Sequence, residues 1–235
     1  MTSEVHNIDC LEYMRTLPDN YFQLAIADPP YGIGAATSEF IRPTRRGNSL
    51  GTSKDYGTSD WDMSAPEQSF FDELRRVSRN QVVWGANHFI ERLPINSPCW
   101  IVWDKKTGDN CYADCELAWT SFDTAVRKFD FMWKGMFQQN MANKEERIHP
   151  TQKPVALYAW LLQHYAKDGD RIFDPMMGSQ SSRIAAYKLG FDYVGCELDK
   201  EYFDKGCERF DRECHGITAT PSGTKYQQTS IFDQC

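Results

Sequence analysis

The last third of the chain alternates strand-like apolar runs with helical patterns. A run at 171–174 leads through a loop into a helical pattern at 179–189, and a run at 193–197 leads into another at 200–214. Strands joined by helices in this way pair in parallel, because each right-handed crossover returns the chain in the same direction. The pattern therefore predicts an α/β fold whose mostly parallel sheet carries helices on both faces.

The first two thirds of the chain add strands and helices in a less regular order. Leu24–Asp28 predicts a buried strand that ends where Pro29 lacks a backbone donor. Ser64 is the predicted cap of one helix, and Pro154 is the predicted start of another. Between about 87 and 147, short apolar runs alternate with charged stretches and predict a small β-rich insertion. We expect its tryptophans to lie in the core: Trp100, Trp103, Trp119 and Trp133.

The 235 residues are enough for one α/β domain, which we place at 1–214. The segment at about 34–62 lacks periodicity and predicts a mobile, functional loop, and the polar segment 215–235 predicts a flexible tail. No run of about eighteen apolar residues indicates a membrane span, and the polar first residues lack a signal-peptide core. We therefore expect a cytoplasmic protein.

Asp28-Pro29-Pro30-Tyr31 follows the first buried strand. The motif puts a carboxylate at the carboxyl edge of the sheet, where open α/β sheets bind ligands. The prolines lack N–H groups, so nearby carbonyls are left free to accept hydrogen bonds. Tyr31 offers an aromatic face. This combination suits a donor-rich exocyclic amino group on a base that has left its stack.

Phe173-Asp174-Pro175-Met176-Met177-Gly178-Ser179 forms a second strand–loop–helix junction. Gly178 permits close approach of the backbone, and the helix that follows offers free N–H groups. About twenty residues further on, Glu197 ends the next strand, where a carboxylate can accept both hydroxyls of a ribose. The spacing indicates a nucleotide-type cofactor; a βαβ unit that merely ends in an acid remains the alternative.

Together these motifs resemble the DNA amino-methyltransferases, in the class whose catalytic motif precedes the cofactor motif. Asn7-Ile8-Asp9-Cys10 resembles the family's opening segment, and Asp28–Tyr31 its catalytic motif. His149-Pro150-Thr151-Gln152-Lys153-Pro154 resembles the segment before a helix that flanks the cofactor's methionine end, and Asp174–Ser179 resembles the cofactor loop. The resemblance covers nearly the whole chain, in family order.

The resemblance implies a Rossmann-like methyltransferase fold with S-adenosylmethionine as cofactor and no metal. The catalytic residues it implies are Asp28, Pro29, Pro30 and Tyr31. The residues implied to contact the cofactor are Asp9, Cys10, Asp28, Lys153, Asp174, Pro175, Met176, Gly178, Ser179, Gln180, Ser181, Glu197 and Leu198. Gln180 departs from the family, which usually has a glycine there. We expect its side chain to reshape the loop or to touch the cofactor's carboxylate.

The implied reaction is methylation of the N6 amino group of adenine in duplex DNA, with the base flipped out of the stack. N4-cytosine methylation is the first alternative, since those relatives more often have Ser in place of Asp28. Methylation of an amide outside DNA is a second alternative, because that family tends to have Asn there. A catalytically silent DNA-binding module is a third, supported only by Gln180.

The net charge of −7 argues little against DNA binding, because the distribution of charge matters more than its sum. The stretch from Arg42 to Lys54 carries four basic residues and no acid before Asp55. The region from about 87 to 147 is the expected target-recognition region. The residues predicted to contact DNA are Arg42, Arg45, Arg46, Lys54, Lys105 and Lys106. A solvated surface loop is the alternative for the arginines.

The tail contains Gln228-Thr229-Ser230-Ile231-Phe232, which resembles short peptides that dock on bacterial sliding clamps. Two apolar anchors on a flexible segment suit binding in a groove. We therefore expect a clamp contact through Gln228, Ser230, Ile231 and Phe232. The resemblance also implies a homodimer. The eight cysteines are irregularly spaced and predict neither disulfides nor a zinc site.

Overall fold

The computed structural model describes residues 1–33, 64–94, 96–108, 113–134, 137–219 and 225–227. Its centre is an eight-stranded sheet in the order β1-β10-β9-β2-β3-β5-β4-β6. The first five of these strands pair in parallel, as the sequence predicts. The strands are β1 (Ser3–His6), β2 (Phe22–Ala27), β3 (Ser78–Trp84), β4 (Trp100–Asp104), β5 (Cys115–Thr120), β6 (Arg127–Asp130), β9 (Arg171–Asp174) and β10 (Asp192–Cys196).

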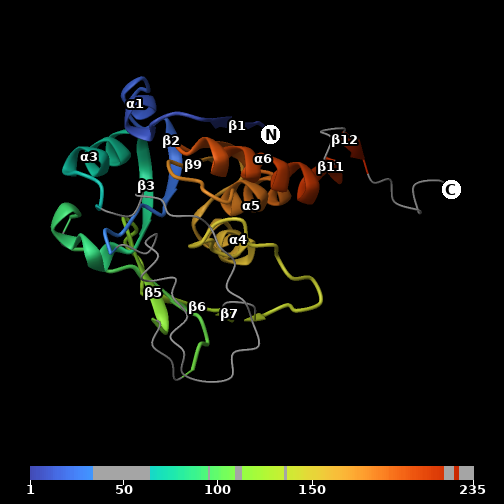
Figure 1. Ribbon diagram of the computed structural model, residues 1–235. Coiled ribbons are helices and arrows are strands. Elements are labelled where there is room, and N and C mark those ends of the chain that lie inside the picture. Colours follow the sequence, from blue (N-terminus) through green and yellow to red (C-terminus); the bar gives the residue numbers. More distant parts are fainter. Residues whose placement is uncertain (34–63, 95, 109–112, 135–136, 220–224, 228–235) are drawn as a thin grey trace.

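Helices cover both faces of this sheet, which confirms the predicted fold class (Figure 1). They are α1 (Cys10–Arg15), α3 (Gln68–Val77), α4 (Val155–Tyr165), α5 (Ser181–Leu189) and α6 (Lys200–His215). Residues alternate between faces along a strand. Ala25 and Ala27 of β2 therefore pack with α1 and α3, whereas Leu24 and Ile26 pack with α4 and α5. Helix α6 packs against α5.

The region from about 87 to 147 is β-rich, but most of it does not form a separate insertion. Strand β5 pairs antiparallel with β3 and β4, and β6 pairs parallel with β4, so all three extend the central sheet. Only β7 (Trp133–Lys134) and β8 (Phe137–Gln138) form a small sheet of their own. The core prediction for the tryptophans is confirmed, because three are buried and Trp100 packs against the core.

Other boundaries differ from the sequence pattern. Helix α3 starts at Gln68 rather than after Ser64, because the chain up to its N-cap Glu67 stays extended. Two short 3₁₀ helices, η1 (Ala86–His88) and η2 (Ile90–Arg92), follow β3. Part of the predicted tail pairs as β11 (Ile217–Ala219) with β12 (Lys225–Gln227).

Two groups of predicted contact residues lie outside the described residues. The first is the loop with Arg42, Arg45, Arg46 and Lys54, and the second is the clamp-like segment with Gln228, Ser230, Ile231 and Phe232. Among the helices of the described part, none is long and apolar enough to cross a membrane.

Phe173 provides a test of the packing beneath the site. Its ring lies parallel to that of Phe22, with centroids 4.4 Å apart, on neighbouring strands of the sheet. We expect Phe173→Ala to lower the free energy of unfolding by about 3–5 kcal/mol, because a buried cavity replaces the ring. Urea unfolding measures this loss. The control is Phe137→Ala, whose ring is 62% exposed and should change stability little. Equal losses in the two variants would contradict the packing described.

Candidate active site

Four acidic residues follow parallel strands at one edge of the sheet. Asp9 follows β1, Asp28 follows β2, Asp174 ends β9 and Glu197 follows β10. Parallel strands present their carboxyl ends at the same edge, so these residues gather there. The Asn7 side chain donates to the Glu197 carbonyl at 2.8 Å and joins the first segment to the last. The structure therefore brings together the motifs that lie far apart in the sequence.

Asp28 is held by a buried lysine and a tyrosine. Lys153 Nζ donates to Asp28 Oδ1 at 2.6 Å, and the Tyr31 hydroxyl donates to the same oxygen at 3.0 Å. Lys153 Nζ also contacts the Tyr31 hydroxyl at 3.1 Å and Glu116 Oε2 at 2.9 Å. The lysine side chain is only 3% exposed. Its ammonium therefore has one acceptor for each of its three N–H groups.

Glu116 is a member of this cluster that the sequence analysis did not identify. It lies near the start of β5, opposite Trp103 of β4, and β5 runs antiparallel to both of its neighbours. The start of β5 therefore meets the edge where the parallel strands end. A single acid within an otherwise apolar strand, Cys115–Thr120, was the available signal, but the antiparallel pairing that directs it to Asp28 is a tertiary property.

The two lysines predicted to contact DNA both form ion pairs with carboxylates of the protein. Lys105 pairs with Glu116, and its side chain is mostly buried, so a phosphate contact by Lys105 would have to compete with this carboxylate. Lys106 is more exposed, and its ammonium lies 3.1 Å from Asp104 and 2.9 Å from Asp130. A phosphate contact by Lys106 would have to compete with these carboxylates.

Burial and neighbouring charges shift the pKa values of the two carboxylates of the cluster in opposite directions. Burial raises the pKa of Asp28 above its usual range, although Lys153 opposes the effect. Burial alone would also raise the pKa of Glu116, but Lys153 and Lys105 together lower it to about 2. Burial would lower the pKa of Lys153, but Asp28 and Glu116 raise it. The lysine therefore stays charged while Asp28 is the more basic of its two partners.

Tyr31 is fixed in orientation by its neighbours. Its ring stacks on His88 at a centroid distance of 5.1 Å, with 16° between the planes. Gly85 lies against the same ring at φ +69°, and a Cβ at that position would come within 2.1 Å of it. A glycine is needed there for both reasons. The hydroxyl of Tyr31 is thus oriented to donate to Asp28, and its ring is held between His88 and Gly85.

The predicted cofactor loop runs from Asp174 to Ser181. Gly178 adopts φ +45°, and its N–H donates to Glu197 Oε2 at 2.9 Å, while the N–H of Asp199 donates to Oε1 at 2.9 Å. Asp174 accepts from the Met176 N–H at 3.0 Å and from the Ser182 hydroxyl, and burial raises its pKa to about 7. Asp174 therefore stabilises the loop by hydrogen bonds to residues at both ends of it.

The surroundings of Glu197 fit an adenosine-type ligand. Its two oxygens have accepted one backbone N–H each, and a carboxylate can accept further hydrogen bonds from ribose hydroxyls. Leu198 follows it and is 68% exposed, which offers an apolar surface for a base. Asp9 uses its carboxylate to cap α1, accepting from the Leu11 and Glu12 N–H groups, and Cys10 lies buried behind it.

Gln180 has its side chain buried against α5 and α6. Its backbone is left-handed at φ +61°, the conformation in which the family has glycine, and its side chain is fully buried. The amide donates to the Phe203 carbonyl at 3.2 Å and accepts from Arg183 at 2.8 Å. A Cβ at Gly206 would lie 2.7 Å from it. The Gln180 side chain thus packs against α6, and its contact with the cofactor's carboxylate stays a prediction.

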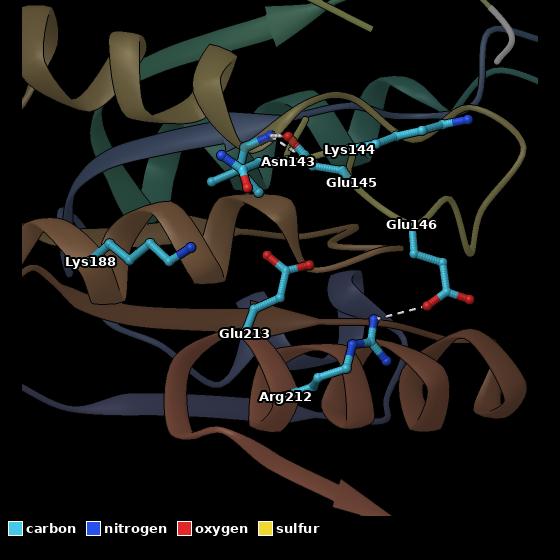
Figure 2. Close-up of a pocket in the computed structure, with 8 residues that line it drawn as sticks. Asn143, Lys144, Glu145, Glu146, Lys188, Arg212 and Glu213 are labelled. Atoms are coloured by element: carbon cyan, nitrogen blue, oxygen red, sulfur yellow. Dashed lines mark hydrogen bonds and ion pairs between the residues drawn. The ribbon is translucent and has the colours of Figure 1, made fainter. Parts of the chain in front are cut away.

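A separate cavity of about 450 Å³ opens between the segment 143–146 and helices α4, α5 and α6 (Figure 2). Its charges compensate one another, since Arg212 pairs with Glu146 at 3.1 Å and both Glu145 and Glu213 pair with Arg209. None of the residues of the Asp28 cluster lines it. The lining residues are Asn143, Lys144, Glu145, Glu146, Val155, Lys188, Arg212 and Glu213.

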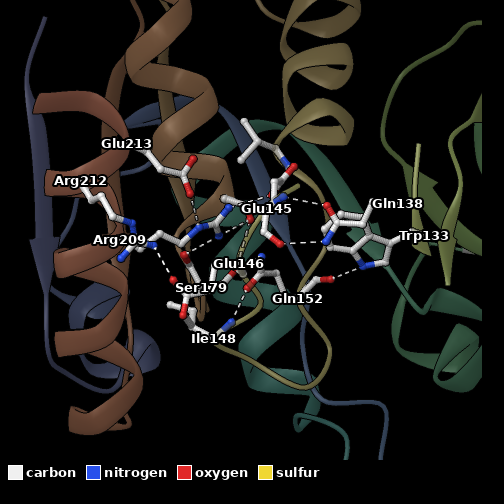
Figure 3. A network of polar contacts seen from close by, with 12 residues as sticks. Trp133, Gln138, Glu145, Glu146, Ile148, Gln152, Ser179, Arg209, Arg212 and Glu213 are labelled. Carbon is white, nitrogen blue, oxygen red and sulfur yellow. Dashed lines mark hydrogen bonds and ion pairs between the residues drawn. The ribbon is translucent and has the colours of Figure 1, made fainter. Parts of the chain in front are cut away.

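Arg209 of α6 fixes the cofactor loop from behind (Figure 3). This fully buried side chain donates to the Ser179 carbonyl at 3.0 Å and to the Ser181 hydroxyl at 2.8 Å. It also pairs with Glu145 at 2.8 Å, and Glu145 accepts from the first N–H of α4. Arg209 therefore joins the cofactor loop to the segment that leads into Lys153.

Arg209→Met should lower the free energy of unfolding by about 3–5 kcal/mol, because it removes a fully buried cation and leaves the mostly buried Glu145 without its partner. Arg212→Met on the same helix is the matched control. Arg212 forms an exposed pair with Glu146, so its loss should cost no more than about 1 kcal/mol. Urea unfolding of both variants measures the difference. Similar midpoints for the two variants would contradict the role assigned to Arg209.

Comparison with known proteins finds similarity to DNA methyltransferases. A family model described as DNA methylase matches residues 98–208. The Type II methyltransferase M.HpaI of Haemophilus parainfluenzae is 24% identical over 271 residues, which cover 96% of this chain and 79% of that protein. M.HinfI of Haemophilus influenzae is 28% identical over 243 residues, covering 83% of this chain and 65% of its own length.

Solved structures share the fold. The complex of M1.HpyAVI with SAM superimposes with a TM-score of 0.54 at 18% identity, covering 88% of this chain and 98% of that one. The cytosine-N4-specific PvuII DNA methyltransferase gives a TM-score of 0.55 at 13% identity, covering 91% and 93%. The ordered motifs, their meeting at one sheet edge and these relatives agree: residues 98–208 match the DNA methylase family model, and most of the chain is similar to Type II DNA methyltransferases.

Proposed function

We propose that this protein transfers a methyl group from S-adenosylmethionine to the N6 amino group of adenine at specific sites in duplex DNA. The observation that carries the proposal is the arrangement of Asp28. Lys153 and Tyr31 both bind its Oδ1 atom. Within the described residues, Oδ2 accepts no hydrogen bond from the protein. One carboxylate oxygen is thus fixed, and the other can receive an amino proton.

The chemistry requires such an acceptor. The amino nitrogen of adenine is a weak nucleophile, because its lone pair is delocalised into the ring. Hydrogen bonds from its N–H groups to the Asp28 carboxylate and the Pro29 carbonyl localise that lone pair and orient it. Asp28 then takes the released proton, directly or through water, and its raised pKa suits this step. Tyr31 bounds the pocket that receives the flipped base.

The residues around the loop fit the cofactor that the M1.HpyAVI structure contains. When bound, S-adenosylmethionine supplies an electrophilic methyl group on a sulfonium. Glu197 would accept the ribose hydroxyls, and Leu198 would cover the adenine. Gly178 and the start of α5 would allow close approach of the backbone. Asp9, Cys10 and the loop residues Pro175, Met176, Ser179 and Ser181 remain proposed neighbours of the cofactor.

Adenine is favoured over cytosine by the catalytic motif itself. Asp28 supplies a full carboxylate, whereas relatives that methylate cytosine more often have Ser there. The PvuII methyltransferase shows that the same fold also serves N4-cytosine methylation, so this product remains the alternative. The silent-module alternative loses its support, because Gln180 is accommodated by α6 rather than obstructing the loop.

DNA recognition is proposed for two regions. The basic loop with Arg42, Arg45, Arg46 and Lys54 would contact phosphates near the flipped base. The region from about 87 to 147 would read the target sequence, because its strands β4, β5 and β6 continue the sheet beyond Asp28 on the side away from the cofactor loop. A homodimer remains a proposal from the family resemblance alone.

Mass spectrometry of nucleosides tests the reaction. Unmethylated duplex DNA is incubated with the protein and S-adenosylmethionine, and digested. We expect an N6-methyladenine peak that falls at least about a hundredfold in Asp28→Ala, because the acceptor and general base are lost. Thermal melting checks that this variant folds. A peak of N4-methylcytosine would overturn the base assignment. Neither product, with cofactor binding absent by calorimetry, would overturn the enzymatic function.

The clamp contact is a separate proposal with its own test. Replacing Ile231 and Phe232 by alanine should weaken binding to a bacterial sliding clamp at least about tenfold in surface plasmon resonance, because both apolar anchors are lost. Methylation of short duplexes should stay unchanged. Asp233 and the polar residues of the tail remain in this variant, so its charge is that of the parent protein. Unchanged clamp binding would end this proposal.

A further inference from the structure

Lys153 is shared between two carboxylates rather than paired with one. Its ammonium lies 2.6 Å from Asp28 Oδ1 and 2.9 Å from Glu116 Oε2, and the two acids come from β2 and β5, on either side of β3. The Tyr31 hydroxyl lies between them, 3.0 Å from Asp28 and 3.3 Å from Glu116. The proposed mechanism uses Asp28 and leaves Glu116 without a role.

A buried lysine paired with Asp28 alone would oppose catalysis. Its charge would draw electron density from the carboxylate and weaken it as an acceptor. It would also compete with the incoming amino group, because a buried ammonium needs an ionised partner. A second carboxylate within reach of the same ammonium removes both difficulties. Glu116 stands in that position, and Lys105 holds it from the other side.

We propose that Glu116 is a positioning residue for methyl transfer, which shares the Lys153 ammonium so that Asp28 remains a strong acceptor for the amino group. This inference rests on the proposed function and adds a residue that controls how strongly Asp28, the proposed base, accepts a proton. Glu116 also gives Lys153 a partner to keep when the amino group binds at Asp28. The ammonium then stays neutralised throughout the reaction without moving into solvent.

The surroundings of Asp28 support this assignment. The groups that face Asp28 or its partners come from every neighbouring element: Tyr31, His88, Glu116, Lys105, His149, Lys153, Tyr158 and Asp174. Among them, Lys153 and Glu116 exert the main charge effects on Asp28, in opposite directions. Glu116 raises the pKa of Asp28, so removing its charge lowers that pKa. Glu116 itself has a pKa of about 2 and stays ionised across the range of an assay.

The variant Glu116→Gln keeps the size of the side chain and removes its charge. We expect kcat to fall severalfold, because a less basic Asp28 is a weaker acceptor for the amino proton. The acidic limb of the kcat profile should move to lower pH, because Asp28 then deprotonates more easily. Cofactor affinity by calorimetry should stay unchanged. Glu116→Asp should recover part of kcat, and exposed Glu208→Gln on α6 is the matched control.

A titration that does not depend on activity completes the test. The carboxyl ¹³C signal of Asp28, assigned by its loss in Asp28→Asn, reports the pKa of this group in the wild-type protein and in Glu116→Gln. A lower pKa in the variant supports the proposal, and an unchanged pKa overturns it. A fall in kcat with an unmoved acidic limb would also overturn it, because a merely structural defect gives that result. If the wild type lacks methylation although the pKa responds, the proposed function fails and Glu116 has no catalytic role.

Discussion

The buried ammonium of Lys153 is the interaction on which the active site depends. It connects Asp28 after β2, Glu116 on β5 and its own position before α4, and it lies near the rings of Trp84 and Tyr31. A charge in such surroundings is stable only while ionised partners surround it. The sheet order meets this requirement, because β2 and β5 lie on either side of β3 and both bring an acid to the same edge.

The cofactor loop is organised by a second buried charge, that of Arg209. It holds the carbonyl of Ser179 and the carboxylate of Glu145 at once. Glu145 caps α4 through the N–H of Val155, two residues after Lys153. The two halves of the site are therefore connected through the backbone around α4. Displacement of the loop at Ser179 and displacement of Lys153 would disturb the same segment.

Gln180 shows how a departure from a family pattern is accommodated. The position needs a left-handed backbone, which glycine adopts most easily. The cost for a glutamine is offset locally, because its amide binds the Phe203 carbonyl and Arg183, and Gly206 leaves room for it. The compensating glycine lies far along the sequence, on α6, and only the packing of α5 against α6 reveals the pair.

The sequence by itself determined the local features of this protein. Apolar runs and helical periodicity located the strands of the last third and the burial of the tryptophans, because strand and helix periods are local properties. The motifs at Asp28, Lys153 and Asp174 indicated the family in the same way. The tertiary structure decided which side chains meet. The start of helix α3, the joining of β4, β5 and β6 to the main sheet, and the pairing of Lys105 with Glu116 all depend on contacts between distant segments. The partner of a buried charge is fixed by strand order and direction, and no local pattern contains either.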